Sequence, residues 1–402
     1  MTRSDSSPIG SLRRWLLGKA VPAQRIVAFD YLRGFIVVLV VLHHSVLAYT
    51  RFSHFDRVHY LWSSAPIVDT SKWLGFDLIV LFNDSYFMPL MFLLSGLFVW
   101  SSLTRKGSLA YARDRLLRLG LPFAVAVVSV IPLAYYPSFR MTGATAGFGE
   151  FWTTTIFHGP WPSGPAWFVG VLLAFDLATA AIHATFRRPT AAGASNFMAR
   201  PLQCFGFLVA LSAIGFLPLL MVAGPSRWLS FGPFAVQSSR IGLYGGYFMA
   251  GILAGRHGLQ RFAAAVENAS AWHWPLLAGM LYLGFVALQI VRRAGWLSLP
   301  PPTWLRLYGL YIVLFCAAAT IAWFAIVVRF VRRPTALGDS LAANTYGIYL
   351  LHYAAVIWLQ YALLDLAGYA IVKATLVFVV ALLLSWGCTI VLRRIPVVAR
   401  VI

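Results

Sequence analysis

The chain has 402 residues, of which 60% are hydrophobic and 11% are charged, and its formal net charge is +20. A soluble domain of this length does not carry so few charges, and the long unbroken apolar runs exclude the alternating pattern of a β-barrel. The basic residues punctuate the apolar runs, so they suit orientation signals and anionic lipid better than nucleic acid. We therefore predict an all-α polytopic transmembrane helical bundle.

The chain divides into a basic cytoplasmic N-terminal segment at residues 1–25, a transmembrane bundle at residues 26–395 and a short tail at residues 396–402. About ten spanning helices are predicted from its apolar runs. In chain order these runs cover about 26–49, 78–100, 116–136, 165–186, 202–223, 240–255, 272–291, 304–330, 345–365 and 369–392. The glycines of the sixth run predict close packing between helices; they are Gly245, Gly246, Gly251 and Gly255.

The distribution of lysine and arginine predicts the orientation of the bundle. If ten helices alternate in direction, 21 of these residues fall on the side that holds both termini and 10 fall on the other side. Because cytoplasmic loops carry the excess of basic residues, we predict that both termini are cytoplasmic. The chain is then a multi-pass protein of the cell inner (cytoplasmic) membrane.

The first run, RIVAFDYLRGFIVVLVVLHHSVLAY, contains ionisable residues at depths where they are costly, which points to an interior position and a function. At about 100° per residue, Asp30, Arg33 and His44 share one stripe, and about 16 Å separates Arg33 from His44 along the helix. His43 points about 80° away from Arg33, and we interpret it as a core histidine. As an alternative, Asp30 and Arg33 form a snorkelling pair that only sets the depth of the helix.

The segment YARDRLLRLGLPF places Arg115 and Arg118 one turn apart at the mouth of the third helix. Two neighbouring guanidinium groups suit phosphates. The alternative is an ordinary topology signal at a cytoplasmic helix end.

The segment TYGIYLLHY places Tyr346, Tyr349 and His352 on one face at the start of the ninth helix, near the cytoplasmic side. An interfacial aromatic belt explains the tyrosines but not the histidine. Asp84 lies at a depth comparable to that of His44 and could orient its imidazole. Asp176, in the middle of the fourth helix, could form a structural pair.

These motifs, in this order and spacing, resemble the acyltransferase-3 family of integral-membrane acyltransferases. The resemblance is carried by D-x-x-R…H (Asp30, Arg33, His44), FMPLMFLLSG (with Ser95), R-x-x-R before a proline (Arg115, Arg118, Pro122), PAWF (Trp167, Phe168) and YGIYLLH (Tyr346, Tyr349, His352). The FMPLMFLLSG run and the lack of a fused extracytoplasmic domain look closest to the branch that succinylates periplasmic glucans. A Ser95–His44–Asp84 triad stays open, although no G-x-S-x-G motif occurs.

The resemblance implies an acyltransferase that uses a cytoplasmic acyl-CoA, acetyl-CoA or succinyl-CoA, and no metal. It implies that Arg115 and Arg118 bind the phosphates of coenzyme A, and that Asp30 and Arg33 shape the donor channel. His44 would act as general base toward a hydroxyl of an extracytoplasmic glycan or glycolipid, or carry the acyl group transiently. The other matched residues would bind donor or substrate: Ser95, Trp167, Tyr346, Tyr349 and His352. The alternative function is a proton-coupled exporter of a small lipid or glycan.

Overall fold

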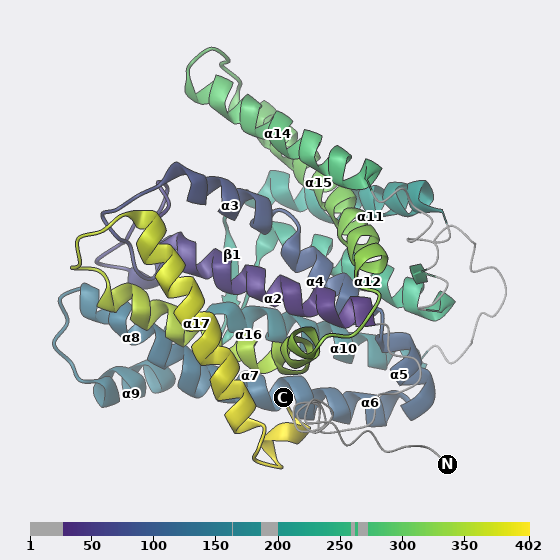
Figure 1. Cartoon of the computed structure of the whole chain (residues 1–402), viewed down its shortest axis with the longest axis horizontal. Coiled ribbons are helices and arrows are strands. Elements are labelled where there is room, and N and C mark those ends of the chain that lie inside the picture. Colours follow the sequence, from purple (N-terminus) through teal and green to yellow (C-terminus); the bar gives the residue numbers. More distant parts are fainter. Residues whose placement is uncertain (1–26, 163, 186–199, 259–261, 264–271) are drawn as a thin grey trace.

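The computed structural model describes residues 27–162, 164–185, 200–258, 262–263 and 272–402, and helices account for most of them (Figure 1). By length and composition, eight helical segments in this part of the chain can cross a membrane. They are α2 (Val27–Leu47), Leu74–Lys106, Ser108–Met141, Gly164–Thr185, α11 (Pro201–Ala223), α14 (His273–Arg293), α15 (Pro301–Phe330) and α17 (Ala370–Leu392). The prediction of an all-α polytopic membrane protein is confirmed. The predicted N-terminal segment 1–25 lies outside the described residues.

The sixth and ninth predicted runs also form helices, α12 (Ile241–His257) and α16 (Ala336–Ala362), although neither is among the eight segments. α12 is not counted because it has only 17 residues, which is short for a spanning helix. α16 buries several polar side chains, namely Asp339, Asn344, His352 and Gln360. α16 packs between α2 and α17, so its polar residues face the centre of the bundle.

The second predicted run is not one helix. It forms α3 (Leu74–Asp84), α4 (Phe87–Gly96) and α5 (Val99–Lys106). Pro89 lies in the first turn of α4, where a proline is tolerated because that turn has no intrahelical donor to lose. The guanidinium of Arg240 donates to the main-chain carbonyl of Asp84 and so satisfies a group that the break exposes.

The third predicted run is longer than about 116–136 and extends over Ser108–Met141. It contains α6 (Ser108–Arg115), α7 (Leu121–Val125) and α8 (Ile131–Met141), joined by π-helical turns at Leu116–Gly120 and Ala126–Val130. Each π-helical turn precedes a proline, Pro122 or Pro132, that has no N–H to donate to the preceding turn. The helix therefore continues through both prolines with local unwinding.

Three elements between the spans were not predicted. α9 (Phe148–His158) follows α8, and an antiparallel hairpin of β1 (Trp228–Phe231) and β2 (Phe234–Gln237) lies between α11 and α12. Gly232 has a φ of +54° in the hairpin turn, a conformation that glycine adopts without strain. Phe234 packs on Phe123 of α7, with ring centroids 4.9 Å apart, and β2 also lies against α10 (Trp167–Thr185).

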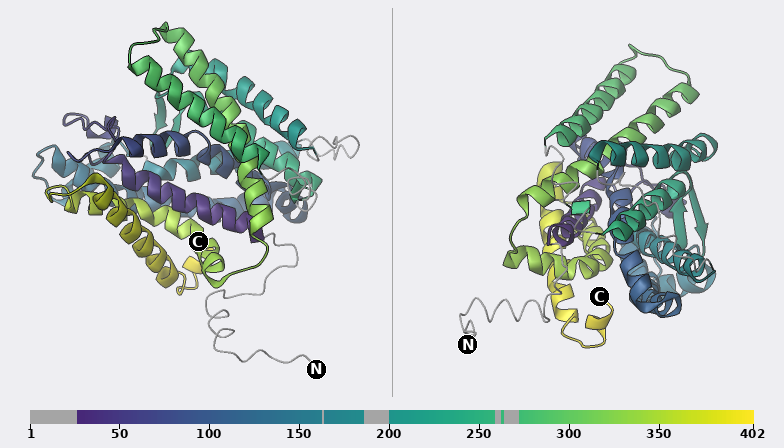
Figure 2. Two further views of the ribbon diagram at one scale, coloured as in Figure 1. Left: turned by 45° about the horizontal axis from the view of Figure 1, so that its top comes forward. Right: turned by 90° about the vertical axis from the view of Figure 1, so that its right-hand side faces the viewer.

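α2 runs through the middle of the bundle, beside and parallel to α16 (Figures 1 and 2). Tyr31 near its start contacts the start of α16 through Asp339, and His44 near its end contacts His352. α17 runs antiparallel to α16, since Arg393 at its end donates to the carbonyl of Ala343. The start of α2 and the end of α17 therefore lie at one end of the bundle, named the basic end below. The opposite end, where α2, α8 and α16 finish, is named the loop end.

Close packing at two of the predicted glycines is confirmed. A Cβ atom added at Gly251 would collide with the carbonyl of Leu93, and one at Gly255 would collide with that of Leu97. These glycines let α12 lie directly against the backbone of α4. Gly245 and Gly246 have ordinary contacts only.

Candidate active site

His44 lies one turn before the end of α2, on the face that packs against α16. Its ring centroid is 5.4 Å from that of His352 and 4.9 Å from that of Tyr353. The side chain of His44 keeps partial exposure, whereas His352 is fully buried. Two histidines that are far apart in the sequence therefore share one space in the interior of the bundle.

The imidazole of His352 is held on one side only. Its Nδ1 lies 2.7 Å from the main-chain carbonyl oxygen of Tyr349, and its Nε2 is buried without a hydrogen-bond partner among the described residues. The hydroxyl of Tyr349 donates to the carbonyl of Pro165, just before α10. The contact with Pro165 anchors this face of α16 against α10.

The prediction that Tyr346, Tyr349 and His352 lie at the start of their helix, near the cytoplasmic side, is wrong for His352. α16 begins at Ala336 rather than at about 345, so His352 lies near the middle of the helix at the level of His44, not near the basic end. Tyr346, six residues before His352 and so closer to the basic end, has a buried hydroxyl without a partner in the described structure. The longer helix explains why the structure joins His352 to the site of His44.

Two tyrosines of the site were missed by the sequence analysis. The hydroxyl of Tyr353 lies 3.4 Å from that of Tyr135 on α8, and the ring of Tyr353 stands edge-on to His44. Tyr353 directly follows His352 in the YGIYLLHY segment, which was the available signal for it. Nothing in the sequence pairs it with Tyr135.

His43 points to a different neighbour. Its ring centroid is 5.1 Å from that of Phe87 on α4, and its side chain is buried. The rings of His43 and His44 are nearly perpendicular, at 84°. The two adjacent histidines thus belong to different contacts, one between α2 and α4 and the other between α2 and α16.

At the basic end, Asp30 and Arg33 are close, with 3.9 Å between Oδ1 and Nη1. The guanidinium of Arg33 stands over the ring of Phe98, 5.3 Å from its centroid. Arg33 is also close enough to Arg115 for the two charges to interact. Arginines from two helices therefore converge at this end, on the stripe that leads along α2 to His44.

Arg115 faces into the bundle. Its Nε lies 3.3 Å from Oδ2 of the buried Asp176, and its guanidinium stands 4.8 Å from the ring centroid of Tyr111. The hydroxyl of Tyr111 donates to Oδ1 of the same carboxylate at 2.5 Å. Asp176 therefore has the structural pairing that the sequence left open for it.

Arg118 faces outward instead. Its side chain is 57% exposed, and its Nε donates to Asp114 at 3.1 Å. Lys106 lies 3.0 Å from the same carboxylate. The structure thus places the two predicted arginines on different sides of one helix, with Arg115 nearer to Arg33.

Three further predicted residues, Ser95, Asp84 and Trp167, contact partners other than His44. The hydroxyl of Ser95 donates to the carbonyl of Met91 within α4, and the carboxylate of Asp84 lies 2.6 Å from Arg240. Neither makes a hydrogen bond to His44 in the described structure, so the Ser95–His44–Asp84 triad is not assembled. Trp167 stacks on Tyr244, with ring centroids 5.4 Å apart. Arg240, fully buried against Asp84, was missed because no spacing in the sequence links them.

A polar pocket of about 630 Å³ opens at the loop end. It is lined by Phe55, Arg57, Val68, Met141, Tyr361, Ala362, Leu364 and Asp365. Its size falls in the range of small-molecule sites. The neighbouring turn is well formed, because the main-chain N–H groups of His59 and Val58 donate to Asp56 and hold the pKa of its carboxyl below the usual range. The pocket lies on the loop-end side of His44, since Tyr361 lines it and the adjacent Gln360 donates to the main-chain carbonyl of His44.

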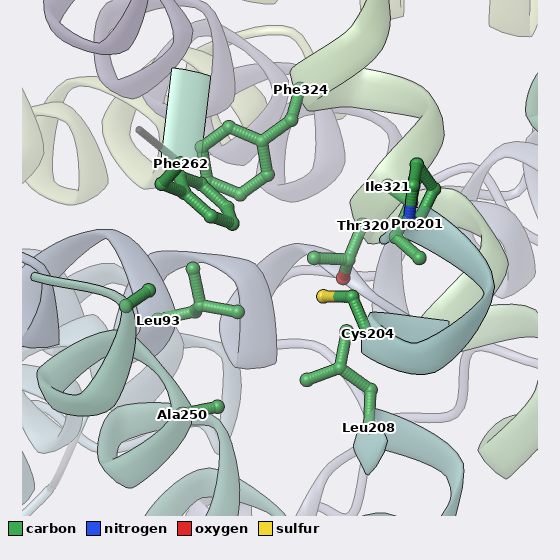
Figure 3. Close-up of a pocket in the computed structure, with 10 residues that line it drawn as sticks. Leu93, Pro201, Cys204, Leu208, Ala250, Phe262, Thr320, Ile321 and Phe324 are labelled. Atoms are coloured by element: carbon green, nitrogen blue, oxygen red, sulfur yellow. The ribbon is translucent and has the colours of Figure 1, made fainter. Parts of the chain in front are cut away.

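A second, narrow pocket lies between α4, α11, α12 and α15 (Figure 3). It is lined by Leu93, Pro201, Cys204, Leu208, Ala250, Ala254, Phe262, Thr320, Ile321 and Phe324, and none of the predicted site residues is among them. This pocket offers little polar chemistry. Among the described residues, no group of three or more His, Cys, Asp or Glu side chains is placed to hold a metal ion.

The fold and the site together define a polytopic membrane protein with facing imidazoles in its interior, between a basic end and a polar pocket. The family model described as an acyltransferase domain matches residues 26–390. The chain therefore belongs to the acyltransferase-3 family and is a membrane acyltransferase, which decides against the alternative of an exporter. Searches among curated proteins and solved structures returned no match to the chain. Its relation to the glucan-succinylating branch stays a prediction.

Proposed function

We propose that this enzyme transfers an acyl group, acetyl or succinyl, from a cytoplasmic acyl-CoA to a hydroxyl of an extracytoplasmic glycan or glycolipid, in the bacterial inner membrane. The observation that carries the proposal is the position of His44. It lies in the interior, partly exposed, between arginines at one end of α2 and a polar pocket at the other. A reaction between substrates from opposite sides of a membrane needs a reactive group at such a depth.

The donor would bind at the basic end. Arg33 and Arg115 converge there from α2 and from the helix Ser108–Met141, and Arg118 adds a further guanidinium outside. Guanidinium groups bind phosphate oxygens through paired N–H donors. The acyl chain of the donor would extend from this end along α2 toward His44, over a rise of about 16 Å from Arg33.

The chemistry needs a base near the thioester. His44 would take the proton of the acceptor hydroxyl while the oxygen of that hydroxyl bonds to the carbonyl carbon of the thioester. The bond from carbon to sulfur then breaks, and the proton passes to the leaving thiolate to give free coenzyme A. Transient acylation of His44 is the second route. Both routes yield one ester and one thiol for each thioester consumed.

The acceptor would approach from the loop end. The pocket there presents Arg57, Asp365 and the aromatic Tyr361, groups that suit the hydroxyls and ring faces of a saccharide. In the described part of the chain, no ion pair joins Arg57 or Asp365 to another residue. Their hydrogen-bonding capacity is therefore free for a ligand.

The direct test uses the purified full-length protein in detergent with acetyl-CoA or succinyl-CoA and an extract of cell-envelope glycans and lipids. We expect release of free thiol and transfer of the acyl label to the extract, each lost in His44→Ala. Mass spectrometry of envelope glycans from a deletion strain then identifies the acceptor. Thiol release that is equal in the wild type and in His44→Ala would overturn the proposal.

A further inference from the structure

The hydrogen bond of His352 determines which of its nitrogens carries the proton. A carbonyl oxygen only accepts, so the contact of 2.7 Å with the carbonyl of Tyr349 requires the proton on Nδ1 of His352. In the neutral ring, Nε2 then has a lone pair and no proton. That nitrogen is buried and meets no donor among the described residues.

His44 has a buried nitrogen that could donate a proton to this lone pair. Its Nδ1 is buried and without a partner among the described residues, whereas the side chain as a whole keeps partial exposure. Nε2 is therefore the nitrogen on the accessible side of the ring. With ring centroids 5.4 Å apart, Nδ1 of His44 and Nε2 of His352 can join through a direct hydrogen bond after a small rotation, or through one water.

We propose that His352 is the positioning residue of the active site, holding His44 in the tautomer that has its proton on Nδ1 and its lone pair on the accessible Nε2. The inference rests on the proposed role of His44 and assigns His352 to that residue rather than to the donor. In this arrangement the backbone of Tyr349 orients His352, and His352 orients His44. The accessible nitrogen is then ready to take a proton or an acyl group.

A neutral acceptor suits this depth. A carboxylate in the same position would carry a charge into the bundle interior, where an unpaired charge is costly. A second imidazole provides a lone pair without a charge. Asp84, the carboxylate that the sequence suggested for this role, is bound to Arg240 instead.

The test measures the reactivity of His44 without any acyl donor. Diethyl pyrocarbonate reacts with an unprotonated imidazole nitrogen, and mass spectrometry of peptides gives the rate of modification at each histidine. We expect His352→Leu to slow the modification of His44 by about two- to tenfold, the effect of losing one hydrogen bond. His352→Gln keeps an acceptor oxygen on a side chain of similar reach, and we expect it to keep most of the reactivity.

The controls separate this role from folding and from the transferase activity. The exposed His54 should react at the same rate in every variant, and His183→Leu makes the same change far from α16. Modification of His44 at the wild-type rate in His352→Leu would overturn the inference, as would equal loss in His352→Gln and His352→Leu. Because the assay uses no acyl-CoA, its result is independent of the thiol-release test of the proposed function.

Discussion

Gln360 of α16 holds the backbone of His44: its Nε2 donates to the carbonyl oxygen of His44 at 2.9 Å and to that of Ser45 at 3.1 Å. The amide is almost fully buried, with 2% of the residue exposed. One side chain thus satisfies two carbonyls near the end of α2. The same contact fixes the distance between α2 and α16, which carry the two facing imidazoles.

Replacement of Gln360 by leucine should therefore lower both stability and activity. Two carbonyls would lose their donor in a buried region, at a cost of about 1–3 kcal/mol in the free energy of unfolding for an unsatisfied group. Thermal unfolding of the purified protein, followed by tryptophan fluorescence, measures the loss, and acyl transfer is measured beside it. Gln289→Leu on α14 is the matched control. A Gln360→Leu enzyme as stable as this control would show that the contact contributes nothing.

The buried pair of Asp69 and Lys373 ties the loop after α2 to the start of α17. Their charged groups are 2.7 Å apart, and both side chains are nearly inaccessible. Removing one partner of such a pair costs about 3–5 kcal/mol, because the other charge stays buried alone. We expect Lys373→Met to lower the thermal unfolding temperature markedly.

A variant with both partners replaced distinguishes the effect of the unpaired charge on Asp69 from the effect of lost packing at Lys373. Asp69→Asn removes the stranded charge but keeps an oxygen for the main-chain N–H of Ser71, which donates to Asp69. Asp69→Asn with Lys373→Met should therefore be more stable than Lys373→Met alone. Lys106→Met breaks a partly exposed pair and should cost at most about 1 kcal/mol. If the double variant is the less stable one, the unpaired charge is not the cause.

The arginines of the basic end differ in orientation, and substitutions should reveal this. Lysine in place of arginine keeps the charge but loses the planar fork that binds phosphate. Loss of one charge-assisted contact corresponds to about a 10- to 150-fold weaker affinity. We expect Arg115→Lys and Arg118→Lys each to raise the KM for acyl-CoA, with Arg115→Lys the more severe. The exposed Arg113 is the control, and Arg113→Lys should leave the KM unchanged. An unchanged KM in both tested variants would leave these residues as topology signals only.

Local periodicity was enough to predict part of this site. Asp30 and Arg33 lie one turn apart on a helix of the expected length, so their contact follows from helical geometry alone. The stripe from Arg33 to His44 is predictable for the same reason. The contacts of Tyr349 and His352 depend on where α16 begins, and periodicity did not predict that residue. Because the helix begins at Ala336 rather than at about 345, His352 lies at the level of His44.

The pairs between distant helices could not be predicted. Asp84 with Arg240 and Arg115 with Asp176 join residues whose meeting depends on how whole helices pack. The break after Asp84 was missed because the run from 78 to 100 was treated as one apolar helix, although the polar residues Asn83, Asp84 and Ser85 interrupt it where α3 ends. These three residues and Pro89 were the signals for the break in the sequence.

The orientation of the bundle leads to a labelling prediction. Thr70, in the loop between α2 and α3, lies at the loop end, and Arg105 lies in the last turn of α5, just before the connection to α6. Both are exposed. With the three native cysteines, Cys204, Cys316 and Cys388, replaced, Thr70→Cys should react with an impermeant maleimide added to intact cells, and Arg105→Cys should react only after lysis. Labelling of Arg105→Cys from outside would reverse the predicted orientation and place the donor on the wrong side.

The adjacent histidines give the sharpest prediction of the site. His44 faces His352 and keeps an accessible nitrogen, whereas His43 packs on Phe87. His44→Ala should therefore lower acyl transfer by at least about 10²–10⁴, the usual contribution of a general acid–base group. His44→Gln should not restore it, since an amide cannot take a proton near neutral pH.

His43→Ala removes a packed ring, so we expect a loss of stability with transfer retained. Transfer by each variant is normalised to the folded protein in the membrane. An inactive His43→Ala beside an active His44→Ala would move the active site to the α4 side of α2, and full activity in both would remove histidine from the mechanism.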